Sequence, residues 1–127
     1  MAALAGCGGE GPLPQICSRP ESADPTAFKG GKVQGCVYQS APWDGELLHF
    51  PGGAYYQIFH QLGVVPSWWL FYLSFERDGV TSGSISQAAG NEVEVKAIDA
   101  ESITVLNGTC AEYWMLARIG AEGCAAH

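Results

Sequence analysis

The sequence predicts an all-β domain, an antiparallel β-sandwich of six to eight short strands, and three observations favour it. From Lys32 onward, short runs rich in Val, Ile, Tyr, Trp and Thr are separated by Gly, Pro, Asn and Asp at close intervals, which is typical of small β-sandwiches. Residues 91–98 alternate between apolar and polar side chains, so one face of that strand should meet solvent. Asn107-Gly108 is the strongest short-range signal for a β-hairpin.

The first expected strands are placed by composition. Residues 32–39 and 46–50 form the first two. Residues 55–63 fit both helical and strand spacing, and we interpret them as a strand. Residues 68–75 are almost continuously bulky and apolar, so we expect a central strand with both faces covered.

The remaining strands follow from local patterning. Residues 80–87 are small and polar and contain Gly83, which favours an edge strand or one arm of a bulged hairpin. Residues 102–106 and 110–119 should pair through Asn107-Gly108, and a three-residue loop with Gly108 left-handed keeps the core face apolar. In residues 91–98 the apolar face would carry Val93, Val95 and Ala97, and the wet face Glu92, Glu94 and Lys96.

The first 31 residues are rich in Gly and Pro, so we expect residues 1–31 to be a flexible linker and residues 32–127 the domain. Leu4-Ala5-Gly6-Cys7 resembles the lipobox that bacterial signal peptidases cut before the cysteine is lipidated. Only three residues precede it, whereas an export signal needs an apolar region of roughly 7 to 15 residues. The match therefore reflects a start further upstream, a trimmed signal, or chance. The resemblance implies a lipid anchor on Cys7.

The cysteine count points to an oxidising compartment. The chain has five cysteines, and setting Cys7 aside for the lipid leaves an even number in a small domain, which predicts two disulfides. Four cysteines allow three pairings. We prefer Cys36 with Cys110 and Cys17 with Cys124, because both bonds would then join the chain ends across the body. The alternative is that these are free, buried cytosolic thiols.

Charge and motifs exclude several classes of function. A net charge of −7 opposes binding to nucleic acid or to anionic lipid. The most apolar stretch, residues 62–75, is too short and too interrupted to cross a bilayer, so membrane contact would come only through the lipid anchor. No Cys and His cluster has zinc-ligand spacing, and we expect neither a metal nor a cofactor.

Signatures of the common enzymes are also absent. Gly6 to Gly11 matches Gly-x-Gly-x-x-Gly, but no strand precedes it and Pro12 follows where a helix should begin, so it is a false positive. The sequence contains no hydrolase elbow, metalloprotease helix or phosphate loop. Two carboxylate pairs, Asp44 with Glu46 and Glu76 with Asp78, are of the kind that glycosidases use, although acids at strand ends are far more often solvated turn residues, because a catalytic pair needs a cleft and opposing geometry. We therefore predict no catalytic residues and favour a binding protein over an enzyme.

The aromatic content suggests a surface for stacking sugar rings. The chain has four Trp and five Tyr, and these rings either fill the core or form such a platform. Trp68 and Trp69 should point to opposite faces of their strand, so at most one can join a single platform. The candidate ligand-binding residues are Trp43, Asp44, Tyr56 and Trp69.

A short motif, His60-x-Leu62-Gly63-x-x-Pro66 followed by an aromatic strand, resembles one that recurs in small β-sandwich modules of phage tail fibres. The wider strand pattern over residues 55–119 is similar to H-type lectin-like sandwiches. The resemblance implies a module for binding or adhesion. The sequence as a whole thus predicts a secreted or periplasmic, lipid-anchored protein of the bacterial envelope, whose partner is a glycan or an envelope protein. The alternative is an envelope hydrolase that acts on polysaccharide through a carboxylate pair.

Overall fold

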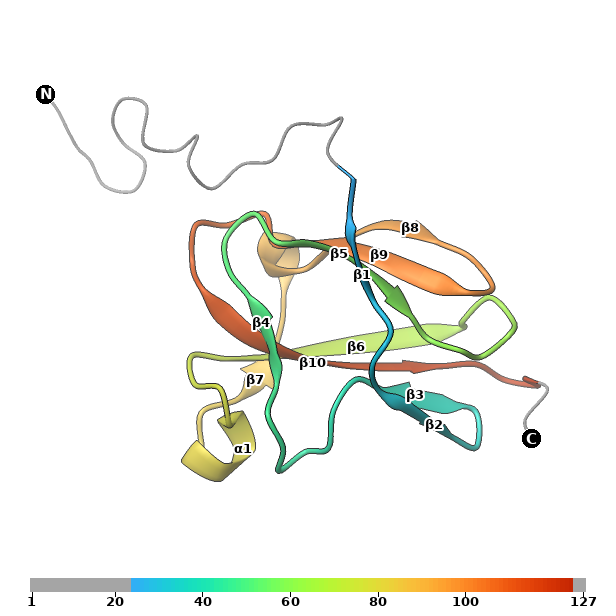
Figure 1. The fold of residues 1–127 in the computed structure, drawn as a ribbon, viewed down its shortest axis with the longest axis horizontal. Helices are drawn as coiled ribbons and strands as arrows, with labels where there is room; N and C mark the ends of the chain where they lie inside the picture. The colour runs from blue at the N-terminus through green and yellow to red at the C-terminus, as the bar shows by residue number, and fades with distance from the viewer. Residues whose placement is uncertain (1–23, 125–127) are drawn as a thin grey trace, which may run out of the picture.

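The computed structural model describes residues 24–124, which form ten strands, one short helix and one 3-10 turn (Figure 1). The predictions for Cys7 and Cys17 lie outside the described residues. No helix in the described range is long and apolar enough to cross a membrane.

A four-stranded sheet has the order β1-β5-β9-β8. Its strands are β1 (Thr26–Phe28), β5 (Tyr55–Phe59), β9 (Ser102–Leu106) and β8 (Glu94–Ile98). β1 runs parallel to β5, while the other neighbours are antiparallel. β1 lies in the stretch expected to be linker, and its pairing with β5 makes it part of the sheet. The ambiguous segment 55–63 does begin with a strand.

The second sheet has six strands, with the order β2-β3-β10-β6-β7. These are β2 (Lys32–Gln34), β3 (Val37–Gln39), β10 (Tyr113–Gly120), β6 (Trp68–Ser74) and β7 (Ser86–Gln87). The sixth, β4 (Leu48–Phe50), pairs with the first part of β10, and β3 pairs with the last part. β10 is therefore the centre of this sheet, with β6 along its other side.

The two sheets lie one above the other, with the four-stranded sheet uppermost in Figure 1. One apolar cluster takes residues from both. Ile58, Ile103 and Val105 come from the four-stranded sheet, and the six-stranded sheet supplies Tyr38, Phe50, Phe71, Leu73, Met115, Ala117 and Ile119. The prediction of an all-β domain built mainly from antiparallel strands is confirmed.

Two segments differ from the expected strands. Residues 32–39 form a hairpin, not one strand, because the chain turns at Gly35, whose φ of 65° belongs to the left-handed region that favours glycine. Residues 80–87 were expected to be extended, but they contain most of the helix α1 (Gly79–Ser82) and only the two-residue edge strand β7. In β8, a bulge between Val95 and Ala97 leaves both exposed, so the predicted apolar face is interrupted.

The predicted hairpin at Asn107-Gly108 is wrong, because β9 and β10 belong to different sheets. Asn107 is only 1% exposed, and its side chain organises the crossing between the sheets. Its Nδ2 donates hydrogen bonds to the carbonyls of Phe50 and Ala111, and its Oδ1 accepts from the backbone N–H and the hydroxyl of Thr109. Asparagine here makes a side-chain-to-backbone turn, which competes with the hairpin turn that Asn-Gly usually signals.

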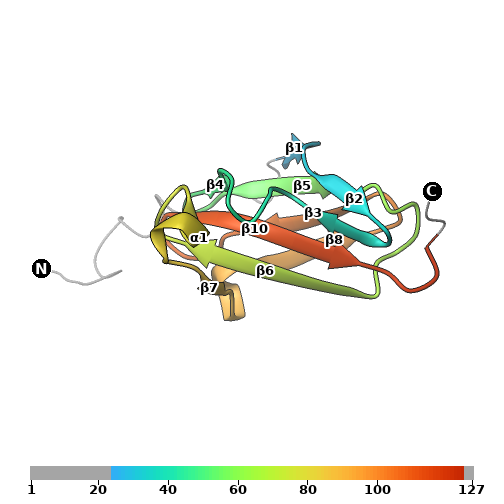
Figure 2. The same cartoon turned by 90° about the horizontal axis from the view of Figure 1, so that it is seen from below.

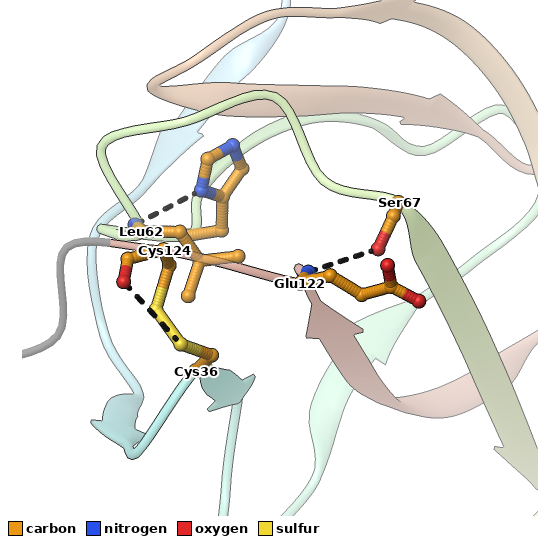
Figure 3. Close-up of a disulfide and its surroundings, with 6 residues drawn as sticks. Cys36, Leu62, Ser67, Glu122 and Cys124 are labelled. Carbon is orange, nitrogen blue, oxygen red and sulfur yellow. Dashed lines mark hydrogen bonds between the residues drawn. A yellow bond between two sulfur atoms is a disulfide. The ribbon is translucent and has the colours of Figure 1, made fainter.

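Two disulfides were expected in the whole chain, and the one seen within residues 24–124 joins Cys36 to Cys124 (Figure 3). The preferred pairing of Cys36 with Cys110 and Cys17 with Cys124 is therefore wrong. β3 and β10 pair so that the N–H of Ala121 donates to the carbonyl of Cys36, which places Cys36 beside the chain that follows β10. Cys110 precedes β10, and eight strand residues separate the two ends by more than about 20 Å. Cys110 is itself disulfide-bonded.

Burial raises the pKa of Tyr38 above its ordinary value of about 10. The ring is fully buried and its hydroxyl donates to the carbonyl of Gly30 at 2.7 Å. A folded-state pKa above the unfolded value contributes stability below about pH 10 that is lost as the pH rises toward the folded value. We therefore expect urea midpoints to fall steeply above pH 10, and to fall less steeply in Tyr38→Phe. Equal slopes in the two proteins would contradict this account.

Candidate functional site

The candidate site lies on the outer face of the six-stranded sheet, which is the face turned away from the core. Since strand side chains alternate, the core residues of β6 and β10 place their neighbours on this face. The register between β6 and β10 agrees with this placement, because the residues of the outer face pair with one another: Trp68 with Gly120, Leu70 with Arg118 and Tyr72 with Leu116. Figure 2 views the molecule from below this sheet. A Cβ on Gly120 would collide with the Trp68 indole, so glycine lets that ring lie against the sheet.

The loop of residues 40–47 covers part of the outer face. Because β3 and β4 pair with different parts of β10, the chain between them must bulge outward. Leu47, at the end of this loop, is buried, as is Leu116 on the sheet, and both lie outside the main core cluster. The rings of Trp43 and Tyr72 meet in a T-shaped arrangement, with centroids 5.0 Å apart. The loop therefore fixes an exposed tryptophan over the sheet.

Beside this loop is an open groove of about 470 Å³. It is formed by β2, β3, the start of the loop and one residue of β10. Its lining is Gly31, Lys32, Gln34, Val37, Gln39, Ser40, Ala41, Pro42 and Arg118. Two side chains are held by local hydrogen bonds: Gln39 Nε2 donates to the carbonyl of Ala41 at 2.7 Å, and Ser40 Oγ accepts from the N–H of Ala117 at 2.8 Å. These bonds hold the floor of the groove in place.

The groove is positively charged. Lys32 and Arg118 line it, and none of the described residues that line it is acidic. The Nε atom of Arg118 is buried without a hydrogen-bond partner. Within residues 24–124, neither cation forms a salt bridge. A chain of net charge −7 therefore has a local site suited to an anionic group.

The two predicted carboxylate pairs line one shallow depression with a volume of about 580 Å³. Asp44 and Glu46 come from the loop, and Glu76 and Asp78 follow β6. Between them, Arg77 lies 3.7 Å from Glu46 and 5.2 Å from the ring centroid of Trp114. The four carboxylates are exposed to solvent. No group of side chains suited to hold a metal is found in the described part of the chain.

The structure does not bring the four predicted ligand-binding residues together. Trp43 and Asp44 lie on the loop over the outer face. Trp69 alternates with Trp68 and lies on the opposite side of β6, at the end of the sheet. Tyr56 belongs to the other sheet, where its ring stacks on Phe50 and its hydroxyl donates to the carbonyl of His49. Of the four, only Trp43 and Asp44 follow directly after the loop residues that line the groove, and Asp44 itself lines the depression.

The histidines of the described range have structural partners. His60 is fully buried, its Nδ1 accepts from the N–H of Leu62, and its Nε2 lies 3.0 Å from the carbonyl of Asp99. His49 pairs with Glu112 and contacts the ring of Trp114. Hydrogen bonds from the N–H groups of Glu101 and Ser102 lower the pKa of Asp99, which organises a turn. None of these contacts resembles a nucleophile with its base.

Sequence reasoning missed Lys32 and Arg118 as site residues. They come from two strands, β2 and β10, and only the pairing of both strands with β3 places them on one face. Arg118 carries one local signal, because it is the only charged residue of a strand otherwise made of apolar and aromatic residues. Such a residue in a central strand requires either a partner or a solvent-filled site.

Comparisons with protein-family models, with curated proteins and with solved structures found no match. The conclusions below therefore depend on the residues themselves.

Proposed function

We propose that this protein is a secreted or lipid-anchored binding protein of the bacterial envelope, and that its outer face binds carbohydrate. One observation carries the proposal: the exposed Trp43 packs on the half-buried Tyr72 beside a groove whose polar lining includes Gln34 and Gln39. A sugar ring has apolar faces that stack on aromatic rings and hydroxyls at its edge that hydrogen-bond to amides. Both kinds of group meet here, on a rigid sheet.

The proposed anchor and fold are consistent with this role. A lipid on Cys7 would place a tether before residue 24, and a flexible chain of this length would lift the domain tens of Å from a membrane. We propose that the stacked sheets form a β-sandwich held by two disulfides, the second joining Cys17 to Cys110. Cys36 and Cys124 are bonded to each other, so Cys17 is the partner that leaves Cys7 for the lipid. Labelling with an alkyne fatty acid in a bacterial host, lost in Cys7→Ala, tests the anchor.

The test of carbohydrate binding uses two tryptophans that differ in position but not in exposure. Trp43 is 38% exposed and Trp69 is 37% exposed, and only Trp43 lies over the outer face. On an array of glycans and cell-wall polysaccharides, we expect saturable binding that Trp43→Ala abolishes and Trp69→Ala retains. Melting temperatures of both variants report any loss of folding.

A blank array, or equal loss of binding in the two variants, would contradict the proposed site. An envelope protein would then be the partner to seek, by capture from envelope extracts.

An envelope hydrolase is the second candidate, favoured by the four carboxylates around one depression. Glycosidases place two carboxyl groups on opposite sides of the scissile bond, and one of them must stay protonated. Turnover of polysaccharide that disappears in Asp44→Asn or Glu76→Gln would support this candidate. Absence of turnover in the wild-type protein would exclude it.

A further inference from the structure

The groove beside the loop has a property that carbohydrate binding alone does not require. Five cations are described, and three of them have partners: Arg77 contacts Glu46 and Trp114, Lys96 contacts Glu94, and Lys29 lies over the ring of Phe59. The other two, Lys32 and Arg118, both line the groove. The unpaired positive charge of residues 24–124 is therefore concentrated at one site.

We propose that this groove binds a carboxylate, and that the ligands of the protein are acidic polysaccharides containing uronic acids. The inference rests on the proposed carbohydrate-binding role and names its substrate class. A guanidinium presents a planar fork of donors that matches the two oxygens of a carboxylate, and a lysine ammonium adds a second charge.

The position of Arg118 supports this assignment. It lies in the middle of the sheet, opposite Gln39 on β3 and Leu70 on β6. These neighbours restrict its side chain, and its buried Nε has no acceptor in the described part of the protein. A buried donor without an acceptor is costly. The guanidinium also has no carboxylate partner within residues 24–124, and a ligand carboxylate would supply one.

The rest of the lining suits the sugar that carries the acid. Gln39 uses its Nε2 to hold the carbonyl of Ala41, which leaves its Oε1 to accept from hydroxyls. Gln34 offers a second amide, and Val37 and Pro42 provide apolar surface. Charge, amide and apolar groups thus lie within one groove of about 470 Å³. A uronic acid residue presents the complement of all three.

The net charge of −7 does not prevent such binding. At physiological salt, charges on the surface are screened over about 8 Å. The groups at the groove then decide the local interaction more than the distant carboxylates do. We expect binding to weaken as NaCl is raised from low to high concentration.

The test is calorimetric titration of the oxidised full chain with oligomers of galacturonic acid and, for comparison, oligomers of galactose of equal length. We expect saturable binding of the acid and at least about tenfold weaker binding of the neutral sugar. Arg118→Gln should lower affinity for the acid roughly 10- to 100-fold. Arg118→Lys keeps the charge but not the fork, so its loss should be smaller. Lys96→Gln removes a cation elsewhere and should have no effect.

The possible outcomes distinguish failure of the carboxylate site from failure of the proposed carbohydrate-binding role. Equal affinity for acid and neutral oligomers, lost in Trp43→Ala, would overturn the carboxylate site and retain carbohydrate binding. A second outcome is that poly-glutamate binds as tightly as the acid oligomer, and that this binding depends on Arg118 but not on Trp43. That result would retain the carboxylate site and overturn the carbohydrate role. If Arg118→Gln melts at the wild-type temperature and binds the acid unchanged, the assignment of Arg118 is wrong.

Discussion

Asn107→Ala should lower the free energy of unfolding by roughly 3–5 kcal/mol, since several buried groups lose their partners together. The carbonyls of Phe50 and Ala111 lose a donor, and the N–H of Thr109 loses an acceptor. These groups lie where the chain passes from one sheet to the other, so water cannot replace the amide without opening the crossing. Urea unfolding followed by tryptophan fluorescence measures the change.

Asn91→Ala is the matched control for this prediction. Asn91 is exposed, and its side chain donates one hydrogen bond to the carbonyl of Gly108, in the same crossing. Its loss should cost less than about 1 kcal/mol. Similar losses in both variants would mean that the Asn107 side chain does not organise the crossing.

Replacing Cys36 and Cys124 together by alanine should lower the free energy of unfolding by about 4–5 kcal/mol. The bond links residues 88 positions apart, and a cross-link of that span restricts the unfolded chain by about this amount in the loop-entropy model. The measurement is the urea midpoint of the double variant against the oxidised wild type. The expected decrease is as large as the whole stability of many small domains.

Peptide mapping under non-reducing conditions provides the control. It should recover Cys36 joined to Cys124 in the wild type, and Cys110 joined to Cys17 in both proteins. Cys110→Ala, measured separately, gives the contribution of the second bond. Free thiols at Cys36 and Cys124 in protein made in an oxidising compartment, or an unchanged midpoint in the double variant, would overturn the prediction.

Strand content was predictable from local patterning, whereas pairing was not. The bulky run at residues 68–75 forms β6, and the ambiguous run after Ala54 forms β5, because β-branched and aromatic residues suit a pleated surface. The Asn107-Gly108 signal failed because the amide was needed for contacts with Phe50, which is distant in sequence. A local motif gives the propensity of a turn, and such distant partners decide which turn forms.

The candidate site was less predictable than the fold. Trp43 was identified from composition, and its position over Tyr72 depends on a loop that two strands of the same sheet force outward. Arg118 could be recognised as a site residue only from the strand pairing, which places Gln39 of β3 beside it. The cysteine pairing failed for the same reason, because the turn at Gly35 moved Cys36 to the far end of β10 from Cys110.

The central place of β10 has a consequence for the order of events during synthesis. β3, β4 and β6 all pair with β10, yet all three leave the ribosome before it. Until residues 113–120 emerge, β3, β4 and β6 lack the neighbour that joins them, and their apolar faces stay uncovered. The six-stranded sheet therefore assembles only after nearly all of the described chain has been made. Such late, long-range pairing is slow and prone to aggregation, so a nascent chain of this protein depends on being kept apart from its copies until its last strand arrives.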